Sequence, residues 1–308
     1  MKQFVHFLLF AILVVLSIKV VAQQEYNKIV VTDTVVKKAT KKYVDGTFWG
    51  THVVNLQSTE KVAPGTLQFM IQHRFGPING GVFQFFGFDQ ASIRLGLEYG
   101  INKLLSVGVG RSNYNKTYDG YVKASLLRQA EGSLPFSVLY FGSIAVNSLH
   151  FSDPERVNYF SSRLAFVNQL IIASKVSDRF SFELVPTIVH KNLVLAATDP
   201  NDFFAVGFGA RYKFSKKMAL NVEYIYRIPP RYKTTPAYAN YYNSVSVGVD
   251  IFTGGHVFQI VLTNSQAMFE AAYITETNQK WTKGGMSLGF NISRDFLLDK
   301  KKATTTSW

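Results

Sequence analysis

The chain alternates apolar and polar residues, one by one, over most of its length after Leu67. In the stretch "ASIRLGLEY", which starts at Ala91, every second residue is apolar and the residues between are polar or small. The stretches "MALNVEYIYRI", "NSVSVGVDI" and "GMSLGFNIS" repeat the pattern. Because successive side chains of a β-strand point to opposite faces, each segment is predicted to be a strand with one apolar and one polar face.

About twelve such segments follow one another, most of them roughly 9 to 13 residues long, close to the ~9 to 11 that a tilted strand needs to cross a bilayer. They begin near Leu67, Ala91, Leu104, Tyr118, Phe136, Phe160, Phe180, Phe203, Met218, Asn243, His256 and Lys283. The even-numbered connections are short and most odd-numbered ones are long. The sequence therefore predicts an all-β fold, a transmembrane antiparallel β-barrel of about 12 strands with short periplasmic turns and long extracellular loops.

A β-sandwich is the alternative fold for alternating strands. It would need apolar partners on its buried face, whereas here Arg, Glu and Gln occupy the middle of the polar face. Lipid on one side and a polar interior on the other explains both faces. Glycines are frequent between His73 and Gly100, but they match neither nucleotide-binding glycine motif, and we expect the inward ones to make room for long side chains.

The N-terminus has the pattern of a secretory signal peptide. Met1-Lys2 is a short basic start, residues 4–15 are nearly all apolar, and a small residue, Ala22, precedes the expected cleavage. The alternative is an uncleaved anchor, although the apolar run is shorter than the ~20 residues of a spanning helix. The predicted organisation is a signal peptide (1–22), a periplasmic arm (23–60), a barrel (61–294) and a C-terminal tail (295–308). The stretch "FWGTHVVNL" of the arm could lie inside the barrel and close it.

Composition agrees with an exported membrane protein. Charged residues make up only 17% of the chain, which leaves a surface too apolar to be covered entirely by water. The formal net charge is +13, and an exported basic chain meets anionic lipid before it meets nucleic acid, so we expect no nucleic-acid partner. With no cysteine, disulfides and thiolate metal sites are excluded.

Charged residues recur on the polar face of the predicted strands, where they would line the lumen. The candidates are Arg74, Arg94, Glu98, Lys123, Arg163, Glu183, Arg211, Glu223, Arg227 and Asp250. They could form a charged constriction that selects anions. They could equally form a salt-bridge network that fills a narrow barrel, with Arg94 pairing with Glu98 and Glu223 with Arg227 along single strands. We favour the network.

Other candidate chemistry is weaker. His150 and Ser152, with Asn147 nearby, have the residue types of a membrane-embedded hydrolase, but "NSLHFSDPER" is predicted to be a loop and a chance occurrence is favoured. His73, His190 and His256 lack the neighbouring ligands of a metal site. The tyrosines of "PPRYKTTPAYANYY" could stack on sugars or bases, or lie at the membrane rim without a ligand. We expect no cofactor and no bound metal.

Several stretches resemble a known family. "HRFGPINGG", "FFGFDQASIRLGLEYGI", "LSVGVGRSNYNKTYDGYVK", "TGGHVFQIVLTNSQ" and "GFNISR" are similar to sequences of membrane-bound β-barrel proteins of unknown function from Bacteroidota. The resemblance spans roughly Thr47 to Arg294 and implies an outer-membrane barrel. It brings no substrate or catalytic residue.

These observations favour a narrow channel or transporter for small, anionic solutes in the outer membrane of a Gram-negative bacterium. Two alternatives remain open: a plugged structural or partner-binding barrel, and a membrane-embedded hydrolase. The expected partners are outer-membrane lipid, small solutes and a periplasmic protein that contacts the N-terminal arm.

Overall fold

The computed structural model describes residues 42–151, 154–155, 157–194, 196–230, 235, 239–253 and 256–299. The predicted signal peptide and most of the predicted C-terminal tail lie outside these residues. Within the described part of the chain, no helix is long and apolar enough to cross a membrane.

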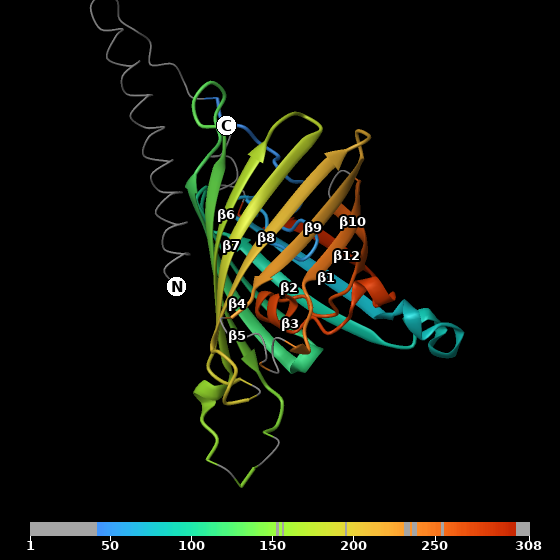
Figure 1. Ribbon diagram of the computed structural model, residues 1–308. Helices are drawn as coiled ribbons and strands as arrows, with labels where there is room; N and C mark the ends of the chain where they lie inside the picture. The colour runs from blue at the N-terminus through green and yellow to red at the C-terminus, as the bar shows by residue number, and fades with distance from the viewer. Residues whose placement is uncertain are drawn as a thin grey trace, which may run out of the picture. The chain divides into compact units, whose positions relative to one another are not determined.

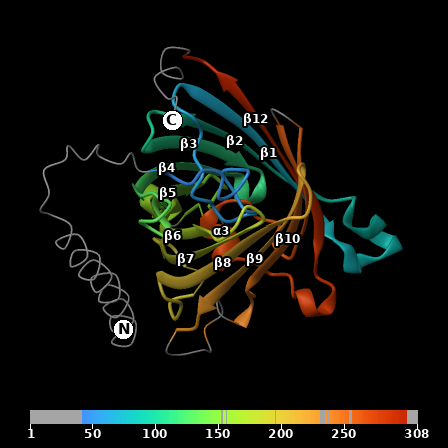
Figure 2. The same ribbon diagram turned by 90° about the horizontal axis from the view of Figure 1, so that it is seen from above.

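Twelve antiparallel strands of the described chain form one closed barrel, in which β1 pairs with both β2 and β12 (Figures 1 and 2). The strands are β1 (Thr66–Pro77), β2 (Ala91–Gly100), β3 (Leu105–Ser112), β4 (Thr117–Leu127), β5 (Ser137–Asn147), β6 (Leu164–Lys175), β7 (Phe180–Lys191), β8 (Asp202–Lys213), β9 (Met218–Ile228), β10 (Ser244–Phe252), β11 (His256–Thr263) and β12 (Ser287–Leu297). Every strand pairs with its sequence neighbours, so the predicted all-β barrel is confirmed.

Two strands begin later in the structure than the sequence pattern predicted. β6 begins at Leu164 rather than near Phe160, and β12 begins at Ser287 rather than near Lys283. In each case a 3-10 turn precedes the strand, η4 (Phe160–Arg163) and η5 (Trp281–Lys283), whose residues continue the apolar and polar composition without the strand geometry. The strands span residues 66–297, so β12 also runs past the predicted limit at residue 294.

The two ends of the barrel differ. At the end that we call the short-turn end, β2, β6 and β8 are joined to the next strand by residues 101–104, 176–179 and 214–217. These turns share a local cause: a side-chain oxygen of Asn102, Ser177 or Ser215 accepts hydrogen bonds from backbone N–H groups two and three residues further on. The opposite, long-loop end carries the connections 78–90, 148–163, 192–201, 229–243 and 264–286.

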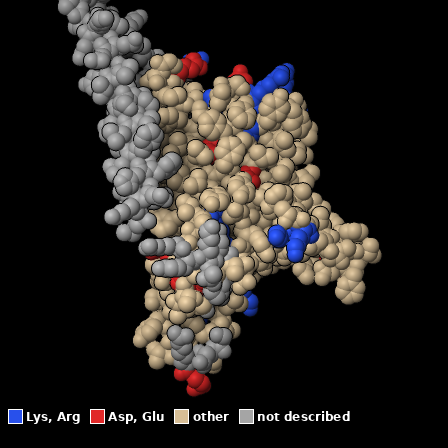
Figure 3. All heavy atoms as spheres, in the orientation of Figure 1, with Lys and Arg blue, Asp and Glu red and all other residues tan. Residues whose placement is uncertain are grey.

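The wall has the predicted two faces. Along β9, Leu220, Val222 and Tyr224 are exposed on the outside, whereas Asn221 and Glu223 are buried inside. The side of the barrel seen in Figure 3 is mostly uncharged over the strands, with its larger groups of Lys and Arg toward the edges. An apolar outer belt of this kind is what a lipid-facing barrel requires.

The inward face of β3 carries only small residues: Ser106, Gly108, Gly110 and Ser112. A Cβ atom at Gly110 would collide with the guanidinium of Arg94, and one at Gly108 with the ring of Tyr121. These glycines therefore make room for long side chains from β2 and β4, as expected from the sequence.

The lumen is filled by two segments of the chain itself. Residues 47–58, which we call the plug, contain a tight hairpin in which Val53 N–H donates to Leu56 O (2.8 Å) and Ser58 N–H to Thr51 O (3.0 Å). The second is the inserted segment, residues 264–277 of the β11–β12 connection, which contains the helix α3 (Glu270–Thr275). Figure 2 shows α3 and the blue N-terminal stretch inside the ring of strands. The neck, residues 59–65, joins the plug to β1.

Candidate functional site: the filled lumen and its vestibule

The plug is attached through its hairpin tip to a carboxyl group of the wall. Glu223 on β9 accepts hydrogen bonds from the backbone N–H groups of Val54, Asn55 and Leu56 at 2.9–3.1 Å. The hairpin tip thus turns three consecutive donors toward one buried carboxyl group. Hydrogen bonds to an ionised acceptor are roughly twice as strong as neutral ones.

The side chain of Asn55 extends this attachment to both sides. Its amide nitrogen donates to Ser246 Oγ on β10 (2.9 Å), and its Oδ1 accepts from Arg74 Nη2 on β1 (3.0 Å). Arg74 also donates to Asn291 Oδ1 on β12 (2.8 Å). The tip is therefore held by side chains from β1, β9, β10 and β12.

Wall amides bind the plug carbonyls. Asn291 Nδ2 donates to Val54 O (3.1 Å), and Gln259 Nε2 on β11 donates to Val53 O (2.6 Å) and to Asp250 Oδ1 (2.6 Å). Polar backbone atoms inside a barrel need such partners because no bulk water reaches them.

The opposite side of the wall pairs mainly with itself. Arg94 on β2 forms a bidentate pair with Asp119 on β4, both side chains being nearly fully buried. Glu98 accepts from Ser106 Oγ (2.6 Å) and Tyr121 OH (3.1 Å) and lies 3.5 Å from Lys123 Nζ. The pairs predicted along single strands, Arg94 with Glu98 and Glu223 with Arg227, are not the ones formed, because residues four apart on a strand lie roughly 13 Å from each other. Arg94 reaches across β3 to Asp119 instead, because β3 has only small residues on its inward face.

Nine of the ten lumen candidates are buried: Arg74, Arg94, Glu98, Lys123, Glu183, Arg211, Glu223, Arg227 and Asp250. Arg211 donates to Gly46 O (3.0 Å), and Lys123 to Thr51 O (2.9 Å). The tenth, Arg163, lies in η4 rather than on a strand, half-buried, and donates to the carbonyl oxygens of Asn147 and Leu149. Arg163 was predicted to line the lumen because the alternating pattern of β6 was assumed to begin before the turn η4.

Several residues of the network were missed. Asp119 and Lys123 are four residues apart on β4 and therefore point to the same face, so Asp119 could have been predicted to point inward. Gln259 and Asn291 also have the inward position of their strands, but as uncharged amides they were not singled out. Asn55, Gln57 and Glu270 lie outside the strands, where alternation gives no signal. Their role follows from contacts between distant parts of the chain.

The plug and the inserted segment pack against each other. Gln57 Nε2 donates to Glu270 Oε1 at the start of α3 (2.7 Å). Phe48, Val53 and Leu56 belong to the same buried apolar cluster as the side chains of α3. The two segments thus form one core inside the barrel.

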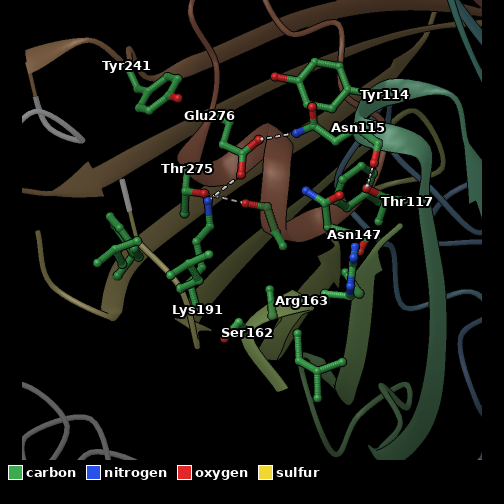
Figure 4. A pocket seen from close by; sticks show the side chains of 18 residues that line it. Tyr114, Asn115, Thr117, Asn147, Ser162, Arg163, Lys191, Tyr241, Thr275 and Glu276 are labelled. Carbon is green, nitrogen blue, oxygen red and sulfur yellow. Dashed lines mark hydrogen bonds and ion pairs between the residues drawn. The ribbon is translucent and has the colours of Figure 1, made fainter. Parts of the chain in front are cut away.

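A cavity of about 420 Å³, which we call the vestibule, opens at the long-loop end above this core (Figure 4). Its floor includes Phe269, Ala271, Thr275 and Glu276 of the inserted segment. Its walls come from the ends of β4 to β8 and from the connections 113–116, 148–163, 192–201 and 229–243. They include Tyr114, Asn115, Asn147, Arg163, Lys191, Phe203 and Tyr241. The volume lies in the range of small-molecule sites.

An ion pair crosses the vestibule. Lys191 Nζ lies 2.5 Å from Glu276 Oε1, and Asn115 Nδ2 donates to Glu276 Oε2 at 3.2 Å. Figure 4 shows Glu276 between these two partners, with Tyr114 and Tyr241 on either side.

The weaker candidates are placed as follows. Ser152 lies outside the described residues, so the hydrolase hypothesis is untested, and Asn147 Oδ1 accepts from the Leu149 backbone. His190 Nδ1 lies 2.7 Å from Asp202 Oδ1 on the exposed rim, and His73 stacks on Phe290 at 4.9 Å between ring centroids. Within the described ranges, no cluster of His, Asp and Glu could hold a metal ion. Much of "PPRYKTTPAYANYY" also lies outside the described residues, although its Tyr241 lines the vestibule.

Solved structures with a similar arrangement include the KdgM porin (12% identity, TM-score 0.45, 75% of this chain and 99% of that chain covered). The NanC porin is similar at 9% identity (TM-score 0.44, 75% and 98% covered). The COG4313 outer membrane channel from Pseudomonas putida F1 is similar at 10% identity (TM-score 0.44, 77% and 97% covered). No curated protein matches the chain.

A family model covers most of the chain. The model of the membrane-bound β-barrel domain DUF5777 matches residues 48–296, which include the plug from Phe48 onward, the inserted segment and nearly all of β12. The predicted membrane-bound barrel family is confirmed, whereas its origin in Bacteroidota stays a prediction. The chain belongs to the DUF5777 family of membrane-bound β-barrel domains.

Proposed function

We propose that the protein is an outer-membrane channel for small, anionic solutes, closed at rest by its own plug. In this orientation the short-turn end faces the periplasm and the long-loop end faces outward, as in barrels with short periplasmic turns.

One observation carries the proposal: the wall pairs differently on its two sides. On β2 to β4 the charged groups pair largely with each other, as Arg94 does with Asp119. On β1 and β9 to β12 the polar groups reach the plug, as Glu223 and Asn291 do. Withdrawing the plug would therefore expose polar groups along β9 to β12 beside the inserted segment, while on the other side only Lys123 would lose a bond to the plug.

Anion preference is supported by the vestibule, which any solute from the long-loop end meets first. Arg163 and Lys191 both line it, against the single carboxylate of Glu276. Side-chain charge at the mouth or constriction of a barrel sets which ions enter.

A structural or partner-binding barrel is the alternative that one observation favours, since plug and inserted segment together fill the lumen. The two functions differ in what happens when the plug is weakened. A channel gains permeability, whereas a structural barrel only loses stability.

The test is tracer uptake into proteoliposomes by a variant with the weakened plug, Asn55→Ala with Glu223→Gln. Gluconate and sorbitol serve as anionic and neutral probes of similar size. We expect slow uptake by the wild type and faster uptake by the variant, with gluconate preferred. Glu131→Gln is the matched control, because Glu131 forms only an exposed pair with Lys42 at the short-turn end. Equal, slow uptake by all folded forms would favour the structural barrel instead.

A further inference from the structure

The carboxylate of Glu276 occupies a position in the vestibule that helix stability does not explain. Glu276 directly follows α3, and a negative charge at the C-terminal end of a helix is opposed by the helix dipole. Its two partners lie outside the inserted segment, Lys191 at the end of β7 and Asn115 in the connection between β3 and β4. The side chains of Lys191 and Glu276 are 15% and 22% exposed, so solutes in the vestibule can reach the pair.

We propose that the vestibule binds a small solute bearing a carboxylate, and that the solute's carboxylate replaces Glu276 on Lys191 and Asn115. The proposal rests on the channel function for its consequence, but not for the binding itself. An ammonium and an amide N–H that already hold one carboxylate are arranged to hold another of the same geometry.

The other lining residues of the vestibule indicate what kind of solute would fit beside the carboxylate. The aromatic side chains of Tyr114, Phe203, Tyr241 and Phe269 line it, and Arg163 offers a second cation. Tyr114 and Phe269 are in edge contact at 6.3 Å between ring centroids, so this wall is already formed. Aromatic faces with a few polar groups suit a ring-shaped solute, such as a sugar acid.

Displacing Glu276 would act on the plug through α3. The ion pair attaches the C-terminal end of α3 to the wall, and Glu270 at the other end accepts from Gln57 of the plug. α3 shares its buried apolar cluster with Phe48 and Leu56. A solute that releases one end of α3 therefore loosens the core that closes the lumen. This couples solute binding to opening through a continuous set of contacts.

The test is calorimetric titration of the detergent-solubilised barrel with glucuronate, using glucose as the uncharged probe. We expect glucuronate to bind, glucose not to bind, and Lys191→Met to abolish binding. Glu276→Gln removes the internal competitor, so it should tighten glucuronate binding by about tenfold. Asp202→Asn is the matched control, because it removes a carboxylate of the same rim that does not line the vestibule; we expect unchanged affinity.

Equal binding of glucose and glucuronate, or an affinity that Glu276→Gln leaves unchanged or weakens, would overturn the proposal. Because binding is measured without conduction, failure here leaves the channel proposal standing. If the barrel binds glucuronate but takes up no solute after its plug is weakened, the binding-site proposal holds and the channel proposal fails.

Discussion

Two buried carboxylates of the lumen, Glu223 and Glu183, are predicted to respond oppositely to the same substitution. Glu223 accepts from three backbone N–H groups of the plug, whereas neither oxygen of Glu183 has a hydrogen-bond partner among the described residues. Glu223→Gln turns an amide toward N–H donors, and we expect it to lower the free energy of unfolding by about 1–3 kcal/mol. Glu183→Gln replaces a buried carboxyl group that has no hydrogen bond to lose, and we expect unchanged or higher stability.

Urea unfolding of both variants in phospholipid vesicles measures the difference. Equal destabilisation by the two substitutions would show that the hydrogen bonds to the plug are not what distinguishes Glu223.

The glycines of β3 and β4 give a second comparison. A Cβ atom at Gly110 would displace the guanidinium of Arg94 from Asp119, whereas one at Gly120 would meet nothing closer than 3.9 Å. We expect Gly110→Ala to destabilise the barrel by about 1–3 kcal/mol, the usual cost of overpacking. Gly120→Ala should leave the thermal unfolding midpoint nearly unchanged, and a similar loss in both would contradict the account of the β2–β4 pairing.

Single residues also show which contacts could not be predicted from the sequence. The inward position of Glu223 follows from strand alternation alone, but its partners Val54, Asn55 and Leu56 lie more than a hundred residues away, and no local pattern points to them. Arg94 was paired with Glu98 because the two are close in sequence. The structure pairs it with Asp119 because β3 is small on its inner face.

The strands themselves could be predicted because alternation is a local property that lipid and a polar lumen both enforce. The starts of β2, β7, β9 and β11 at Ala91, Phe180, Met218 and His256 were placed correctly. The plug was identified only as a stretch that could lie inside, since a hairpin held by wall side chains needs no alternation. α3 lies within a connection that was expected to be a loop.

The neck offers a pH-dependent prediction through Lys61, whose ammonium donates to Ser125 Oγ. Burial lowers the pKa of Lys61 to about 8, below its ordinary value. Below pH 8 the group is charged in both the folded and the unfolded chain. Between pH 8 and about 10.4 the folded chain releases the proton first, so the free energy of unfolding rises with pH.

Lys61→Met should therefore lose its stability advantage over the wild type as the pH rises. From pH 7.5 to 9.5 we expect the wild type to gain about 1–2 kcal/mol relative to the variant. Unfolding midpoints at the two pH values measure this. A constant difference would mean that the ammonium of Lys61 is solvated in the folded chain.

The molecule as a whole combines a wall on β2 to β4 that pairs mainly with itself, apart from the bond of Lys123 to Thr51 O, with a plug-bound wall on β1 and β9 to β12. In the proposed channel, this asymmetry would let the N-terminal hairpin leave while most pairs of the barrel wall persist. Closure by the plug can be tested with an introduced disulfide, because the sequence has no cysteine and the introduced cysteines would be the only thiols.

The most direct test of closure by the plug is single-channel conductance of a variant with Val54→Cys, Gly248→Cys and Glu223→Gln. A Cβ atom at position 248 would lie 3.0 Å from Val54 Cγ2, close enough for a disulfide between plug and wall. We predict silence while the disulfide is intact and stepwise openings after reduction of the same molecules. Openings of equal size before reduction would contradict closure by the plug, and so would silence of the reduced, folded barrel.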